Sequence, residues 1–328
     1  MQDIALSSTA AHMLGLTFAS MYVGSIYVSK EARLVFNAQL TAVDSTGVGK
    51  PRERSRADNE RWRDDPDVIR ARLTAVTIAT VLCITSVCWI TQSIPTALSL
   101  LGLWPSFPTS LTSLRHVVAP HLITPLLFLG PLYAKFLSFS PRNHWRGNLS
   151  TRTKLLLCNV TGLRNYIVAP ITEEIVFRAC VLSVYLLSPT LAASEIGLVL
   201  TTPLNFGVAH LHHAWDTYNR LGRTTAALKR ALLISLFQMV YTTLFGALCT
   251  YLFLQTHYSI LVPIAAHIFC NIMGFPDFRE DLRLGEGDGR KGVVIAAYLL
   301  GVVGFVYSVS PAGRWWWSFA ENIEVLLR

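Results

Sequence analysis

The sequence predicts an all-α, polytopic membrane protein with about eight transmembrane helices around a polar cavity that faces the cytosol. Three observations lead to this prediction. Of the 328 residues, 52% are hydrophobic and only 15% are charged, whereas a soluble globular chain carries about 25% charged residues. The apolar residues form runs long enough to cross a bilayer, and the basic residues gather in alternate loops. These features predict a single membrane-embedded domain over residues 1–328.

The expected spans follow from the apolar runs, since a helix needs about 20 mostly apolar residues to cross a membrane. The fourth, fifth and seventh runs also contain polar residues, and the fifth and seventh are compatible with short or re-entrant helices. The prolines inside several runs are tolerated where neighbouring helices satisfy the backbone. The eight expected spans are 10–29, 73–92, 117–139, 166–187, 190–212, 231–255, 258–275 and 292–310.

One long polar segment separates the first two spans. It contains "GKPRERSRADNERWRDD", and residues 34–63 form a polar insert whose composition is typical of a solvated or disordered cytosolic loop.

The orientation follows from the positions of the basic residues. If the eight spans alternate, 23 of the 28 Lys and Arg residues lie in loops on one side of the membrane and three lie on the other side. The positive-inside rule places the basic loops in the cytoplasm and both termini outside or in a lumen.

The fourth expected span contains charged residues that a lipid-facing helix would exclude. In "ITEEIVFRAC", Glu174 and Arg178 are four residues apart, the spacing of a helical ion pair. Glu173 is rotated by about 100° from Glu174 around the helix and so addresses another helix. Charges inside a membrane are costly, and a functional polar cavity is the default explanation for them.

Two other expected spans bring polar side chains to a similar depth. The fifth ends in "FGVAHLHHAWD", which places His210 near the cytosolic end, and the seventh contains "PIAAHIFCNIMGFP" with His267 and Asn271 four residues apart. A partly buried glutamate beside an imidazole can act as a general base toward water. Two donors on one helix face suit an oxyanion. We therefore predict an amide hydrolase in which Glu173, His210, His267 and Asn271 are catalytic.

Three alternatives stay open at this level. A zinc site could draw on several of the acidic and histidine residues, although the sequence has no HExxH motif. A transporter would line a path with the same groups, but no inverted repeat is visible. A non-catalytic binding module could hold a ligand with the same groups without turnover. The residues available to a zinc ion are Glu173, Glu174, His210, His212, His213 and His267.

Three motifs resemble the signatures of the Ras-converting CAAX prenyl endopeptidase family, the eukaryotic branch of the intramembrane CAAX-protease and bacteriocin-processing (abortive-infection) family. They are "TEEIVFRACVLS", "FGVAHLHH" and "HIFCNIMGFP". The resemblance covers residues 10–310 apart from the insert. It implies eight transmembrane helices around a cytosol-facing cavity, a metal-independent mechanism without a cofactor, and residence in the endoplasmic reticulum membrane. With the orientation given by the basic residues, this residence would make both termini lumenal.

The resemblance also implies the reaction and the role of each residue. The expected activity is cleavage of a prenylated CAAX sequence after the lipidated cysteine. Glu173 would activate water with His210, while His267 and Asn271 would stabilise the oxyanion and Glu174 and Arg178 would support the site. The implied partners are membrane lipid and farnesylated or geranylgeranylated CAAX proteins such as Ras-like small GTPases, and no nucleic acid.

Overall fold

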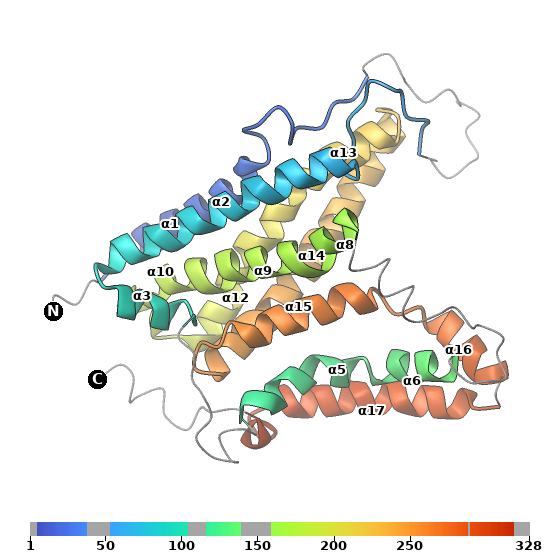
Figure 1. Ribbon diagram of the computed structural model, residues 1–328. Helices are drawn as coiled ribbons and strands as arrows, with labels where there is room; N and C mark the ends of the chain where they lie inside the picture. The colour runs from blue at the N-terminus through green and yellow to red at the C-terminus, as the bar shows by residue number, and fades with distance from the viewer. Residues whose placement is uncertain (1–4, 38–52, 104–115, 139–158, 288, 318–328) are drawn as a thin grey trace. The chain divides into compact units, whose positions relative to one another are not determined.

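The computed structural model describes residues 5–37, 53–103, 116–138, 159–287 and 289–317 (Figure 1). The chain divides into two compact units. Unit 1 comprises Met1–Leu101 and Ile171–Tyr251, and unit 2 comprises Gly102–Pro170 and Leu252–Arg328. The described residues form helices and no β-strand, apart from an isolated antiparallel bridge between Val35 and Arg61. The predicted all-α class is confirmed.

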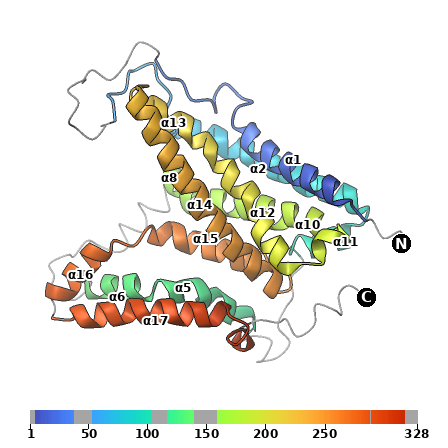
Figure 2. The same ribbon diagram turned by 180° about the vertical axis from the view of Figure 1, so that it is seen from behind.

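Unit 1 is built around helices that pack on α1. Its elements are α1 (Ser8–Ser25), α2 (Pro66–Thr91), α3 (Ile94–Leu100), most of α9 (Ala169–Glu174), η3 (Ile175–Cys180), α10 (Val181–Leu186), α11 (Pro189–Ala192), α12 (Glu195–Ala209), η4 (His210–His212), α13 (His213–Arg220) and most of α14 (Thr225–Gln255). Helix α1 contacts α2, α10 and α12, and both views show α1 alongside α2 (Figures 1 and 2).

Local sequence explains two features of this packing. Helix α2 begins at Pro66, because proline lacks the N–H that the first helical position would leave unpaired anyway. In α1, Gly15 allows a close approach to α10, since a Cβ atom there would lie 2.9 Å from the ring of Tyr185. The Tyr185 hydroxyl is also 2.9 Å from His12 Nδ1, which joins the same two helices.

Unit 2 is a second helical group. Its elements are η1 (Ala119–Leu122), α5 (Ile123–Leu127), α6 (Leu129–Ser138), α8 (Val160–Leu163), η2 (Arg164–Val168), α15 (Leu261–Met273), α16 (Phe278–Gly287), α17 (Lys291–Val309) and η5 (Arg314–Trp316). Helix α17 lies along α5 and α6 (Figure 2). Gly130 permits this contact, because a Cβ there would lie 2.3 Å from the ring of Tyr298.

The predicted number of spans is not confirmed, although helix occurs within every expected span. Among the described residues, only α2, α14 and α17 are individually long and apolar enough to cross a membrane, and two bent pairs raise the number to five if each pair is one span. The bends are 73° between 116–127 and 129–137 and 66° between 261–273 and 278–286. The fourth and fifth expected spans consist of shorter consecutive helices, α9–η3–α10 and α11–α12–η4.

Candidate active site

The Glu174–Arg178 pair predicted from the i, i+4 spacing is present. Arg178 Nε lies 2.9 Å from Glu174 Oε2, and the two side chains are 1% and 0% exposed. Glu174 ends α9 and Arg178 lies in η3, a π-helical turn, and such turns are frequent at functional sites. The guanidinium carbon of Arg178 is 4.1 Å from the ring centroid of Phe206 on α12. The acid and the aromatic ring together hold a buried cation.

Glu173 has different surroundings from the neighbouring Glu174. Its side chain is half-buried, and its carboxylate is close enough to the phenols of Tyr22 and Tyr241 to act on them electrostatically. The preceding Thr172 hydroxyl is 2.8 Å from the Tyr22 hydroxyl. Glu173 thus lies in unit 1, in electrostatic range of Tyr22 of α1 and Tyr241 of α14.

The tautomer of His210 follows from its contact with the backbone. His210 Nδ1 lies 2.8 Å from the carbonyl oxygen of Phe206. Since a carbonyl only accepts hydrogen bonds, Nδ1 carries a proton, and in the neutral imidazole Nε2 is then the acceptor. The Phe206 ring packs edge-to-face on the imidazole at 4.5 Å between centroids, so Phe206 contacts both His210 and Arg178.

Phe206 is a neighbour of His210 and Arg178 that the sequence did not single out. The signal was its position four residues before His210 in "FGVAH", the spacing at which a helical carbonyl meets the following side chain.

His267 and Asn271 lie in unit 2, on α15 as predicted. His267 is buried and Asn271 is exposed. Asn271 Nδ2 donates a 2.8 Å hydrogen bond to the backbone carbonyl of Asn165 in η2. An amide nitrogen carries two hydrogens, so this contact orients the group and leaves a second N–H for another acceptor.

The four predicted catalytic residues therefore divide between the units. Glu173 and His210 belong to unit 1, and His267 and Asn271 belong to unit 2. The meeting of all four in one cavity stays a prediction.

The zinc alternative concerns the same acids and histidines. Within the parts of the chain that the structure describes, no group of three or more His, Cys, Asp or Glu residues is arranged to hold a metal ion. His212 and His213 stand at the junction of η4 and α13 with ring centroids 4.0 Å apart, and His212 Nδ1 is 2.6 Å from the Ala209 carbonyl oxygen.

Comparison with known proteins gives the family. A family model described as type II CAAX prenyl endopeptidase Rce1-like matches residues 156–273. CAAX prenyl protease 2 of Homo sapiens is 31% identical over 315 residues, which cover 90% of this chain and 79% of that protein. Its counterpart in Arabidopsis thaliana is 37% identical over 211 residues, covering 60% of this chain and 63% of that protein.

A third relative, the probable CAAX prenyl protease 2 of Schizosaccharomyces pombe, is 34% identical over 221 residues, which cover 65% of this chain and 70% of that protein. No solved structure matches the chain at a significant level. The family match includes both glutamates of "ITEEIVFRAC", His210, His267 and Asn271. The protein is therefore a membrane-embedded member of the Rce1-like family of type II CAAX prenyl endopeptidases.

Proposed function

We propose that the protein is an intramembrane endopeptidase that cleaves prenylated C-terminal CAAX sequences after the lipidated cysteine and releases the aaX tripeptide. The observation that carries the proposal is the single family match over residues 156–273, which contains every residue assigned to the site. Family membership and the human relative, which aligns with 90% of this chain, support this activity.

The geometry of unit 1 supports Glu173 as the general base. Glu174 is engaged by Arg178 at 2.9 Å in an apolar interior, which suits a supporting role. Glu173 lies half-buried on a different side of the same helix. In general, a carboxylate is most effective as a general base when its pKa lies near the pH of the medium, and burial shifts the pKa of a carboxylate in that direction.

The reaction then follows from ordinary amide hydrolysis. Glu173 accepts a proton from a water molecule whose oxygen attacks the carbonyl carbon of the prenylated cysteine, and His210 Nε2 accepts a hydrogen bond from the same water. His267 and Asn271 donate to the oxyanion that forms. The tetrahedral intermediate breaks its C–N bond, the proton passes to the departing amine, and the prenylcysteine keeps a new carboxylate.

The substrates and the location extend the same proposal. Farnesylated or geranylgeranylated proteins such as Ras-like GTPases remain at the bilayer through their lipid. The excess of basic residues in alternate loops supports a cytosol-facing site and lumenal termini, and the endoplasmic reticulum membrane is the proposed residence.

Tripeptide release from a farnesylated CAAX peptide by the purified full-length protein tests the proposal. Glu173→Gln is expected to lower kcat by about 10²- to 10⁴-fold, the range for loss of a general base. Glu280→Gln is the matched control, because Glu280 is an exposed acid on α16. Full activity in Glu173→Gln would overturn the assignment of the base, and an inactive wild-type protein would overturn the activity.

Metal dependence is tested in the same assay. We expect activity to persist in the presence of a chelator and elemental analysis to find less than one equivalent of zinc. Loss of activity on chelation with recovery on adding zinc would favour the metalloprotease alternative.

A further inference from the structure

The segment between α1 and α2 makes contacts that its composition does not predict. We call its described residues, 26–37 and 53–65, the strap. The two stretches of the strap pair through the bridge between Val35 and Arg61, whose N–H groups donate to each other's carbonyls at 3.0 and 2.9 Å. The two described stretches of the polar insert are therefore held to each other by backbone hydrogen bonds.

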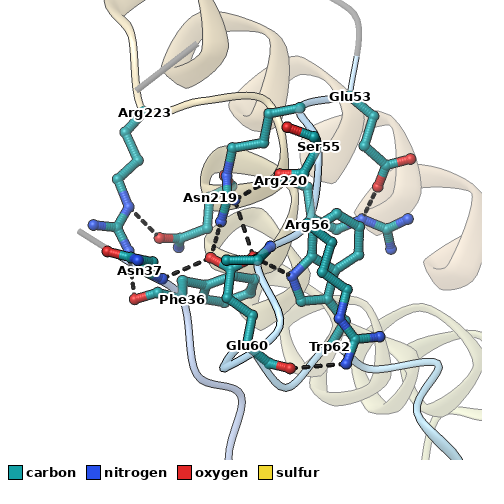
Figure 3. A network of polar contacts seen from close by, with 12 residues as sticks. Phe36, Asn37, Glu53, Ser55, Arg56, Glu60, Trp62, Asn219, Arg220 and Arg223 are labelled. Carbon is teal, nitrogen blue, oxygen red and sulfur yellow. Dashed lines mark hydrogen bonds and ion pairs between the residues drawn. The ribbon is translucent and has the colours of Figure 1, made fainter. Parts of the chain in front are cut away.

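Glu60 is the centre of the strap (Figure 3). Its side chain is 0% exposed and pairs with Arg54, which is 4% exposed. Arg54 donates to both carboxylate oxygens, at 2.5 and 3.0 Å, and Asn37 N, Ala57 N and Trp62 Nε1 donate at 2.6, 3.1 and 3.1 Å. Burial raises the pKa of Glu60, but the N–H donors, Arg54 first, outweigh it and hold the pKa at about 2. Glu60 is thus a buried, ionised and fully engaged acid.

Arg54 connects this centre to α13. Its backbone N–H donates to the carbonyl of Arg220 at 3.0 Å, and its Nε donates to the carbonyl of Asn219 at 2.9 Å. These carbonyls belong to the last turn of α13, where a helix has unpaired acceptors and the negative end of its dipole. Arg54 therefore caps α13, and Glu60 holds Arg54 in place (Figure 3).

Arg220 strengthens the same junction. It pairs with Glu53 of the strap, and its guanidinium carbon lies 5.0 Å from the ring centroid of Trp62. Asp64 and Asp216 are 3.5 and 3.7 Å from its Nη1.

The strap also contacts η4, the turn that precedes α13. Tyr27 packs edge-to-face on His212 in η4, with ring centroids 6.3 Å apart. Arg33 supports Tyr27 by donating from Nε to its carbonyl at 2.6 Å, and Arg72 of α2 donates to the carbonyl of Ala32 at 2.8 Å. The stretch from His210 to Arg220 is therefore contacted by the strap near its beginning and at its end.

We propose that the strap clamps residues 210–220 and that Arg54 and Glu60 are positioning residues for His210. The proposal rests on the proposed function, in which His210 orients the attacking water. His210 opens the 3₁₀ turn η4 that leads directly into α13, so the placement of its imidazole depends on how that segment is held. A displacement of about 1 Å at a reacting group can cost about 10²-fold in rate.

Hydrogen exchange tests the clamp without reference to activity. In the purified full-length protein, Glu60→Gln removes the charge that holds Arg54, and we expect amide exchange in residues 210–220 to become about tenfold faster while α15 and α17 are unchanged. Asp67→Asn is the matched control, because Asp67 is an exposed acid that pairs with Arg70 on α2. Unchanged exchange in residues 210–220 of Glu60→Gln would overturn the clamp.

Tripeptide release tests the consequence for catalysis. We expect Glu60→Gln to lower kcat about tenfold and to change KM by less than about twofold, because the strap orients a catalytic group and does not bind substrate. Glu60→Asp retains the charge and should recover part of the loss. If Glu60→Gln fails to fold, Arg54→Lys keeps the positive charge but loses the forked geometry, and it should show the same kcat effect in weaker form.

The outcomes separate the two proposals. If the wild-type protein releases no tripeptide, the proposed function fails and exchange alone decides the clamp. If the wild-type protein is active, two results would overturn the positioning role. In the first, Glu60→Gln keeps the wild-type kcat. In the second, kcat falls, KM changes by more than about twofold, and hydrogen exchange becomes faster throughout the protein.

Discussion

Unit 1 contains two buried glutamate–arginine pairs that are held in different ways. Glu60 and Arg54 lie in the strap, and backbone and side-chain N–H groups satisfy Glu60 with directed hydrogen bonds. Glu174 and Arg178 lie within one helical turn at 2.9 Å, yet none of the three guanidinium nitrogens of Arg178 makes a directed hydrogen bond to the residues that the structure describes.

Two aromatic rings and the carboxylate of Glu174 stabilise the buried guanidinium of Arg178. The ring centroids of Phe206 and Phe245 lie 4.1 and 5.8 Å from its guanidinium carbon, so charge proximity and aromatic faces replace hydrogen bonds. One pair thus organises a loop through directed hydrogen bonds, whereas the other keeps a cation inside an apolar helical core. Removal of the acid should therefore have local effects in the first case and global effects in the second.

The largest expected loss of stability comes from substitution of Glu174. Glu174→Gln leaves a buried, uncompensated cation, and we expect the free energy of unfolding to fall by about 3–5 kcal/mol. Glu60→Gln should cost about 1–3 kcal/mol, because Arg54 keeps its backbone partners and the amide can still accept hydrogen bonds. Denaturant unfolding in detergent measures both losses, with Asp67→Asn as control, and equal losses would contradict the distinction.

A smaller effect is expected at Phe206. Phe206→Leu removes the aromatic face 4.1 Å from Arg178 but keeps the backbone carbonyl that accepts from His210, so stability should fall by about 2 kcal/mol, the size of a desolvated cation–π contact. Phe245→Leu is the matched variant, since its ring is 5.8 Å away. A larger loss in Phe245→Leu would show that the aromatic contact does not decide the stability of Arg178.

The smallest effect concerns pH. Burial lowers the pKa of His213 well below its usual value, and the charges of His212 and Arg63 act in the same direction. The unfolded chain takes up a proton as the pH falls through about 6.5 while the folded chain does not, so folding loses stability below that pH. The advantage of the wild type over His213→Asn should shrink by about 1 kcal/mol between pH 7.5 and 5.5. Denaturant unfolding of both proteins at the two pH values measures this difference. An equal difference in the free energy of unfolding at pH 7.5 and 5.5 would contradict the prediction.

The sequence predicted what depends on local spacing. The apolar runs located helices at every expected span, and the i, i+4 spacing of Glu174 and Arg178 predicted their contact, because both are properties of neighbouring residues. The difference in burial between Glu173 and Glu174 also follows from the helical rotation between them. Individual span lengths were less predictable, since the polar fourth and fifth runs form consecutive short helices with π and 3₁₀ turns.

Contacts between distant residues were not predictable. The polar composition of the insert predicted a solvated loop, and composition does not indicate which side chains contact one another. The cap from Arg54 to Arg220 joins residues far apart in the chain, and the bond from Asn37 to Glu60 spans 23 positions. The entropy lost in closing such loops is offset only when the contacts form together.

The sequence by itself determined the membrane class and the motif residues of the family, because these depend on composition and on spacings within one helical turn. The sidedness that the basic residues suggest stays a prediction. Only the tertiary structure decided that Phe206 joins Arg178 to His210 and that the strap caps α13. Those contacts depend on segments that meet in space, where a buried charge or an unpaired helix end requires a partner from elsewhere in the chain.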